Sequence, residues 1–335
     1  MNDIPPTARV MQVLMGVMNS AAVSAIARLG IPDHLHSGPK TVEELAHAVG
    51  AKPELLFRLM RATAGLGILT QTPDGRWEQT PMSDVLRSDA TETLRHFACL
   101  IADDWHVRAL GSLDETVRTG EQATDRIYGM PVFAYFAKDQ KSAENFNRAM
   151  TSFSTVEAPT IAKAYDFSGI RSLTDVGGGH GLFLATILEN HPDMNGTLFE
   201  LPQVVHSLAG GPLERFKNRV RVVAGDMFTS VPAGADAYTM KRIVHDWSDE
   251  QCEKILSSCR AGVTKGGKLL VVDSVVPADA NYDPSKVMDL MMMLFSGGKE
   301  RTEKEFSALF AASGWRLNGI IPTASPLSII EGVPV

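Results

Sequence analysis

The chain has 335 residues, of which 44% are hydrophobic and 21% are charged, and this composition excludes an intrinsically disordered protein. Because a single hydrophobic core rarely grows beyond about 300 residues, the length favours two domains. The formal net charge of −7 disfavours a nucleic-acid partner, and the three cysteines, which form no C-x-x-C pair, disfavour a disulfide framework or a zinc site, so we expect no metal.

The first 20 residues contain one basic residue and two prolines, and their apolar pattern is broken by Gln12, Gly16 and Asn19. This pattern is unlike a signal peptide or a membrane span, so we expect a cytoplasmic protein with no membrane partner. Four apolar residues recur at the spacing of a helical stripe: Met11, Leu14, Met15 and Met18. Little nearby chain can cover this stripe, which predicts a homodimer built largely by the N-terminal domain.

The next segment, residues 21–89, predicts short helices followed by a β-hairpin. Thr41-Val-Glu-Glu44 is a capping box that opens a helix over 42–49, and Pro53 lies near the first turn of the following helix. The turn Pro73-Asp-Gly75 joins two strand-like runs into the hairpin. Helices followed by such a hairpin are typical of a winged helix, a fold that often binds DNA.

The charges of this segment argue against DNA binding. Between residues 41 and 90, five Lys or Arg residues face seven Asp or Glu residues. The presumed recognition helix carries only Arg58 and Arg61 as cations, whereas a phosphate-reading surface should be basic. Packing and dimerisation are therefore the better interpretation.

From about Arg171 onward, apolar strand-like runs alternate with helical runs. This alternation predicts a doubly wound α/β sheet, in which ligands bind beyond the carboxyl ends of the strands, where the strand order reverses. The predicted strands cover residues 172–176, 197–200, 220–223, 235–240, 268–273, 315–321 and 327–330.

The first of these strands continues into Asp175-Val-Gly-Gly-Gly-His-Gly181, a D-x-G-x-G-x-G pattern. Glycines leave the turn without side chains, so backbone amides and the positive end of the following helix can approach a ligand closely. A nicotinamide dinucleotide fingerprint would need Gly or Ala where Leu182 or Leu184 stands, which disfavours an oxidoreductase.

The next two strands end in further candidate ligand-binding residues. Glu200 ends the second strand, where an acid can accept hydrogen bonds from ribose hydroxyls. Gly225-Asp-Met-Phe228 follows the third, where a carboxylate can take an adenine amino group while Met227 and Phe228 pack against the ring. Singly, these elements are equally a turn glycine, a surface acid and a core sulfur. In this order they predict a ribose-bearing cofactor.

Five segments resemble the small-molecule O-methyltransferases of plant phenolic and bacterial antibiotic pathways: DVGGGHG, FELP, GDMF, MKRIVHDWSDEQC and GGKERTEKEF. The resemblance covers nearly the whole chain. It implies a class I methyltransferase (Rossmann-like) sheet domain over residues 166–335, an N-terminal helical, winged-helix-like dimerisation domain over 1–100, and a helical linker over 101–165 that contributes to the substrate pocket. It also implies S-adenosylmethionine as cofactor and supports the homodimer.

The resemblance further assigns the cofactor-binding roles. The residues that would bind S-adenosylmethionine are Gly177, Gly179, Gly181, Glu200, Asp226, Met227 and Lys241. Glu200 departs from the more usual aspartate, although its longer side chain can still accept two hydrogen bonds.

His245 follows the fourth strand, before a capping box at Ser248–Gln251, and therefore lies at the ligand-bearing edge. Methyl transfer to a phenol needs removal of the acceptor's proton, and imidazole can accept it. We therefore expect His245 as general base, although its position alone also suits a helix entry. The family usually places two glutamates beside this histidine; here Asp273 and Glu300 stand at those positions, and Glu300 is the preferred orienting group.

The expected acceptor pocket is apolar, with Met150, Phe153, Met291 and Asp246 as the residues that touch substrate. Two alternatives remain open. An N-methyltransferase of the same fold would need no strong base if its acceptor amine were neutral. A non-catalytic, ligand-sensing winged-helix regulator would need the basic recognition helix that is missing.

Overall fold

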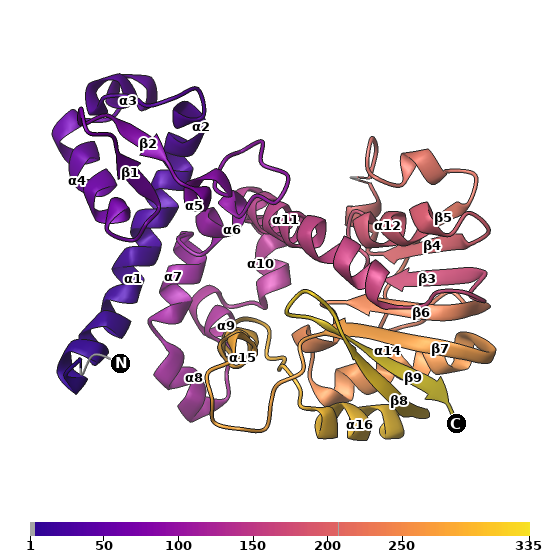
Figure 1. Cartoon of the computed structure of the whole chain (residues 1–335). Helices are drawn as coiled ribbons and strands as arrows, with labels where there is room; N and C mark the ends of the chain where they lie inside the picture. The colour runs from indigo at the N-terminus through magenta and orange to yellow at the C-terminus, as the bar shows by residue number, and fades with distance from the viewer. Residues whose placement is uncertain (1–3, 207) are drawn as a thin grey trace. The chain divides into compact units, whose positions relative to one another are not determined.

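The computed structural model describes residues 4–206 and 208–335, and Figure 1 labels most of its helices and its strands. The chain forms two compact units. The N-terminal unit comprises the residues up to Gly111 together with Phe133–Phe153, and the sheet unit comprises Ser112–Val132 together with Ser154–Val335. One boundary falls inside a long helix, α11 (Gln140–Ala164). The three-part division at residues 100 and 165 stays a prediction.

The N-terminal unit is mostly helical. Its predicted hairpin forms, with β1 (Leu69–Gln71) antiparallel to β2 (Trp77–Gln79), and the Thr41 capping box is present at the start of α3. Buried residues from these elements, with Trp77 among the largest, form the core of the unit. The helices are α1 (Pro6–Leu29), α2 (Ile31–Leu35), α3 (Val42–Val49), α4 (Pro53–Ala64), α5 (Pro81–Asp84), α6 (Arg95–Leu100), α7 (Asp104–Leu110), most of α10 (Val132–Lys138) and the first part of α11.

Helix α1 exposes a large apolar surface. Seven of its residues leave between 48% and 78% of their surface exposed: Val10, Met11, Val13, Leu14, Met15, Val17 and Met18. Among the described residues, α1 is the one helix long and apolar enough to cross a membrane, by length and composition only, whereas the sequence pattern had set a membrane span aside. An apolar face of this size marks an interaction surface.

The sheet unit is built on a seven-stranded sheet with the order β5-β4-β3-β6-β7-β9-β8 (Figure 1). The β7–β9 and β8–β9 pairs are antiparallel and the other four pairs are parallel, so the sheet is mostly parallel, as predicted. Each predicted strand is confirmed to within a few residues at its ends. The strands are β3 (Ser172–Val176), β4 (Asn195–Glu200), β5 (Val220–Ala224), β6 (Ala235–Lys241), β7 (Val263–Asp273), β8 (Trp315–Pro322) and β9 (Ser328–Pro334).

Apolar side chains cover both faces of this sheet. One buried cluster joins the sheet to α12 and the end of α11, and the other joins it to α14 and α16. Chain order reverses between β3 and β6, which lie side by side. Ligands bind at such a point in doubly wound sheets. The helices of this unit are α8 (Leu113–Thr119), α9 (Ala123–Tyr128), α12 (Leu182–Asn190), α13 (Pro202–Val205), α14 (Asp249–Gly262), α15 (Pro284–Phe295) and α16 (Glu303–Ala312), with 3-10 turns η1 (Glu214–Phe216) and η2 (Val244–Asp246).

Candidate active site

The glycine loop follows β3 at the point where the strand order reverses. Gly177, Gly179 and Gly181 have φ of 69°, 57° and 78°, a region that favours glycine. A Cβ on Gly177 would come within 2.5 Å of the Ile243 side chain, and one on Gly181 would clash with Leu213, whereas one on Gly179 would meet nothing within 4 Å. The loop is therefore packed at both ends and open at Gly179, where a ligand can approach the backbone.

Glu200 joins the end of β4 to this loop. Its Oε1 accepts a hydrogen bond from the Gly179 N–H at 3.1 Å, and its Oε2 accepts one from the Leu201 N–H at 2.5 Å. Burial raises the pKa of this carboxyl. A carboxylate has about four lone-pair directions, and two remain for ribose hydroxyls. The longer side chain of glutamate therefore still reaches the glycine loop.

Asp175, on β3 just before the glycine loop, is almost completely buried. Its Oδ1 accepts a hydrogen bond from the Thr239 hydroxyl at 2.9 Å, and burial raises its pKa to about 7. A Cβ on Gly178 would clash with the other carboxyl oxygen of Asp175. Asp175 thus supports the underside of the glycine loop from β3.

Residues after β5 form the next part of the site. Asp226 is exposed, and its Oδ1 accepts a hydrogen bond from the Phe228 N–H at 2.9 Å. The Phe228 ring packs edge-on against Trp247, with ring centroids 4.7 Å apart. Met227 joins the same apolar cluster. The sequence motif had placed Met227 and Phe228 beside an adenine ring, and Trp247 is an aromatic neighbour that the motif alone did not assign.

Lys241 ends β6, and its mostly buried side chain and that of Arg242 flank the buried Glu157. The Glu157 carboxylate lies 3.4 Å from Lys241 Nζ, and it accepts hydrogen bonds from Arg242 Nε at 3.2 Å and from Arg242 Nη2 at 2.5 Å. Although burial acts in the opposite direction, these two cations hold the pKa of Glu157 below its usual value, while burial lowers the pKa of Lys241. The end of β6 is therefore fixed to α11 by an ion cluster.

His245 lies in η2 with only 6% of its surface exposed. Its Nδ1 is 2.8 Å from Glu300 Oε1 but 4.0 Å from Asp273 Oδ1. Since one ring N–H can bond well to one of these acceptors, Glu300 is the partner of Nδ1. The Nε2 atom faces Asp246, with Oδ1 at 3.9 Å, too far for a hydrogen bond.

Three carboxyl groups surround this imidazole, and burial raises the pKa of each. The pKa reaches about 7 for Glu300 and about 6 for Asp273 and Asp246. Both Asp273 oxygens and Glu300 Oε2 are buried with no hydrogen-bond partner among the described residues. Groups with perturbed pKa values around one base are typical of a catalytic centre.

Two known domain families match the chain. The O-methyltransferase domain matches residues 110–316, and the O-methyltransferase dimerisation domain matches residues 11–89. The chain belongs to the O-methyltransferase family.

The relatives of this O-methyltransferase include enzymes of secondary metabolism. Phenazine O-methyltransferase PhzM of Lysobacter antibioticus is 36% identical and covers 99% of this chain and 97% of its own. The mitomycin biosynthesis 6-O-methyltransferase of Streptomyces lavendulae is also 36% identical, over 95% and 92% of the two chains. One relative acts on nitrogen: the 8-amino-8-demethylriboflavin N,N-dimethyltransferase of Streptomyces davaonensis is 34% identical, over 92% and 89%.

Solved structures give the cofactor. CalO1, a methyltransferase in calicheamicin biosynthesis solved with bound S-adenosylhomocysteine, matches with a TM-score of 0.88 and 34% identity over 100% of both chains. NcsB1, from neocarzinostatin biosynthesis, was solved with S-adenosylmethionine and 2-hydroxy-5-methyl naphthoic acid; it matches with a TM-score of 0.78 and 29% identity over 94% and 96% of the chains. This O-methyltransferase uses S-adenosylmethionine.

The structure brings most of the predicted site residues to one edge of the sheet. The glycines, Glu200, Asp226, Met227, Lys241, His245, Asp246, Asp273 and Glu300 all follow or end β3, β4, β5, β6 or β7, or lie in the loop before α16. Met291 is half-buried on α15. Met150 and Phe153 belong to the N-terminal unit, where the Phe153 ring packs on Phe97 at 4.9 Å.

Sequence reasoning missed Glu157 and Arg242. No spacing pattern marks Glu157, because its partners lie 84 and 85 residues further along the chain. Arg242 has φ of 56° although it is not glycine, and such residues are uncommon enough to indicate a constrained position. The MK pair in the sequence pointed to Lys241 but not to the residue after it.

Proposed function

We propose that this O-methyltransferase transfers a methyl group to a phenolic hydroxyl of a small aromatic metabolite, with His245 as the general base. The observation that carries the proposal is the fixed imidazole. Glu300 engages Nδ1 at 2.8 Å, whereas Nε2 makes no hydrogen bond to the described residues, and Asp246 Oδ1 lies 3.9 Å from it. A base held in this way presents one nitrogen to the acceptor.

The cofactor side of the site fits S-adenosylmethionine. Open space at Gly179 and the two unused acceptor directions of Glu200 suit a ribose, while Asp226, Met227 and Lys241 lie at the neighbouring strand ends. When bound there, the cofactor supplies an electrophilic methyl group. The chain's own part is to orient the acceptor oxygen, to exclude water around the buried His245 and to take the hydroxyl proton on Nε2.

The relatives support an aromatic acceptor. Phenazine is an aromatic ring system in the name of one relative, and NcsB1 was solved with a hydroxy-naphthoic acid. We propose Met150, Phe153, Met291 and Asp246 as acceptor contacts, with Asp246 on the Nε2 side of the base. The cytoplasmic location and the homodimer also stay proposals, the latter supported by the matching dimerisation domain.

Replacing His245 with alanine tests the base. Affinity for S-adenosylhomocysteine should stay near that of the native protein, because no proposed cofactor contact includes His245, whereas turnover of a phenolic acceptor should fall by about 10²–10⁴-fold. The variant should recover at alkaline pH, where solvent ionises a phenol directly. Single-turnover rates of both proteins across a pH series measure this.

If His245→Ala kept the native turnover rate at neutral pH, the assignment of His245 as the general base would be wrong. An amine acceptor would then be preferred, because a neutral amine needs no base for attack and one relative is an N,N-dimethyltransferase. Rates with matched phenol and aniline acceptors separate the two functions.

A further inference from the structure

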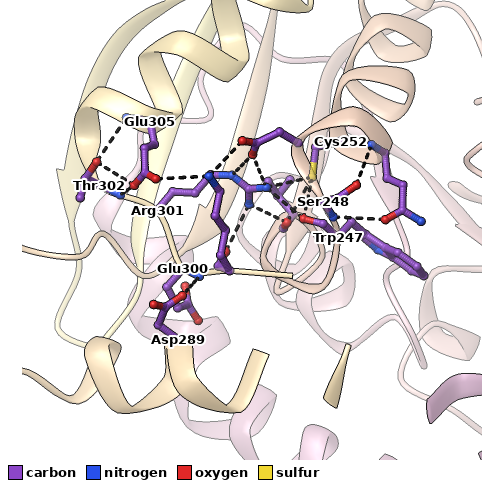
Figure 2. A network of polar contacts seen from close by, with 12 residues as sticks. Trp247, Ser248, Cys252, Asp289, Glu300, Arg301, Thr302 and Glu305 are labelled. Carbon is purple, nitrogen blue, oxygen red and sulfur yellow. Dashed lines mark hydrogen bonds and ion pairs between the residues drawn. The ribbon is translucent and has the colours of Figure 1, made fainter. Parts of the chain in front are cut away.

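Arg301 directly follows Glu300 and is completely buried. Figure 2 shows it at the centre of a polar network. Its Nε and Nη2 donate to Asp249 Oδ1 at 3.0 and 2.8 Å. Its remaining N–H groups donate to three backbone carbonyls: Val244 at 2.8 Å, Trp247 at 3.0 Å and Lys299 at 3.3 Å. All five guanidinium donors therefore have an acceptor.

Two of these carbonyls enclose the proposed base in sequence. Val244 precedes His245, and Trp247 follows Asp246, so Arg301 holds the short turn η2 on both sides of the imidazole. The same arginine is covalently joined to Glu300. One side chain thus connects the segment that carries the base to the segment that carries its hydrogen-bond partner.

The backbone of Arg301 adds a third connection. Its carbonyl accepts a hydrogen bond from the Val276 N–H at 2.9 Å, and Arg301 forms a parallel bridge with Val275. This segment begins two residues after Asp273, the end of β7. Arg301 therefore contacts the segment that carries His245 and the segments that carry the two carboxyl groups near its Nδ1, Glu300 and Asp273.

The two loops are also packed without spare room. A Cβ on Gly298 would clash with the His245 carbonyl oxygen, so the loop before Glu300 runs directly against the backbone of the base. The Glu300 N–H donates to Asp289 Oδ1 at 2.9 Å, which anchors this loop to α15 (Figure 2). A shift of either loop would therefore change the distance between Nδ1 and Oε1.

We infer that Arg301 is a positioning residue that sets the contact between His245 and Glu300. It touches neither substrate nor cofactor and acts through the carbonyls of Val244 and Trp247. Lysine cannot replace it, because an ammonium carries three donors on one atom and cannot span acceptors on both sides of η2. The catalytic part of this inference rests on His245 being the base.

The test compares Arg301→Lys with His245→Ala and with a control, Arg219→Lys. Arg219 likewise donates to three backbone carbonyls, those of Leu188, His191 and Met194, but it lies at the opposite ends of the strands. Three quantities are measured: single-turnover rates across pH, affinity for S-adenosylhomocysteine, and the ring N–H resonances of ¹⁵N-labelled histidine, with the His245 resonance assigned from its loss in His245→Ala.

Arg301→Lys should shift or remove the His245 Nδ1–H resonance and slow turnover at neutral pH by about 10–10²-fold, with recovery at alkaline pH and near-native cofactor affinity. Arg219→Lys should leave the resonance and the pH profile unchanged even if it lowers thermal stability. A native resonance in Arg301→Lys would overturn the inference, and so would a loss of rate that is the same at every pH.

A second variant keeps the test decisive if Arg301→Lys does not fold. Asp249→Asn neutralises the half-exposed carboxylate that orients the guanidinium but leaves the carbonyl acceptors in place. It should move the same resonance by less, and an unmoved resonance would contradict the inference. Because the resonance reports geometry, it separates a failure of this inference from a failure of the base assignment, which His245→Ala tests alone.

Discussion

The reactivity of the proposed base, His245, should depend on the protonation of one neighbour, Glu300. Burial raises the pKa of Glu300 to about 7, and its Oε1 lies 2.8 Å from Nδ1. Below this pH a protonated Glu300 donates to Nδ1, so the ring's own proton sits on Nε2 and blocks it as a base. Above it the carboxylate accepts from Nδ1–H and leaves Nε2 free. Activity should therefore rise as pH increases through about 7.

Glu300→Gln tests this dependence. The variant loses the negative charge that stabilises the imidazolium, so turnover should fall by about 10²-fold or more and the rise near neutral pH should disappear. Asp273→Asn is the matched control, because Asp273 lies 4.0 Å from Nδ1 and should matter less. Equal losses in the two variants, measured as kcat across pH, would contradict the assignment of Glu300 as the orienting group.

Glu200 should contribute to cofactor affinity. Removing its carboxylate in Glu200→Ala takes away the proposed acceptor of the ribose hydroxyls and should weaken S-adenosylhomocysteine binding by roughly 1–3 kcal/mol. The control Glu189→Ala removes an exposed carboxylate that pairs with Arg215 and should leave binding unchanged. Calorimetry decides between these outcomes, and native affinity in Glu200→Ala would remove Glu200 from the site.

At the scale of elements, the strands and their ends could be predicted because the information is local. Buried parallel strands are short apolar runs, and each predicted run is a strand. The glycine loop, Glu200 and His245 lie at or just after the ends of these strands, so predicting the strands also placed these residues. Glu157 and Arg301 could not be placed this way, because their partners are distant in sequence or are backbone carbonyls, which leave no pattern in side-chain types.

The ion cluster between α11 and β6 gives a prediction at this scale. Glu157 is buried between Lys241 and Arg242, so Glu157→Gln would leave two mostly buried cations without this counter-charge. The free energy of unfolding should fall by about 3–5 kcal/mol. Glu144→Gln, on the same helix, breaks an exposed pair with Arg148 and should cost less than about 1 kcal/mol. Denaturant unfolding measures both, and similar costs would show that the cluster is dispensable.

For the whole molecule, the main apolar feature that the described residues leave exposed is the face of α1. In the sheet unit, the alternation of strand-like and helical runs predicted the α/β class, and the motifs predicted the cofactor and the family. A stripe at Met11, Leu14, Met15 and Met18 was also visible in the sequence. The structure extends it to Val13 and Val17, which are 78% and 76% exposed. The sequence analysis did not include these two valines, because they do not fall on the i, i+3, i+4 and i+7 positions counted from Met11.

We expect a second copy of the chain to cover this face, since the matching dimerisation domain includes most of α1. The double substitution Val13→Glu and Val17→Glu would place two charges in an apolar interface, where their desolvation is costly. The double variant should therefore sediment as a monomer at micromolar concentration, whereas the native protein should sediment as a dimer. Val117→Glu, which adds a charge at an exposed valine on α8, should remain dimeric. A native protein that is monomeric under these conditions would contradict the dimer. If the native protein then sedimented together with lipid vesicles, the result would indicate that α1, the described helix apolar enough to span a membrane, contacts lipid.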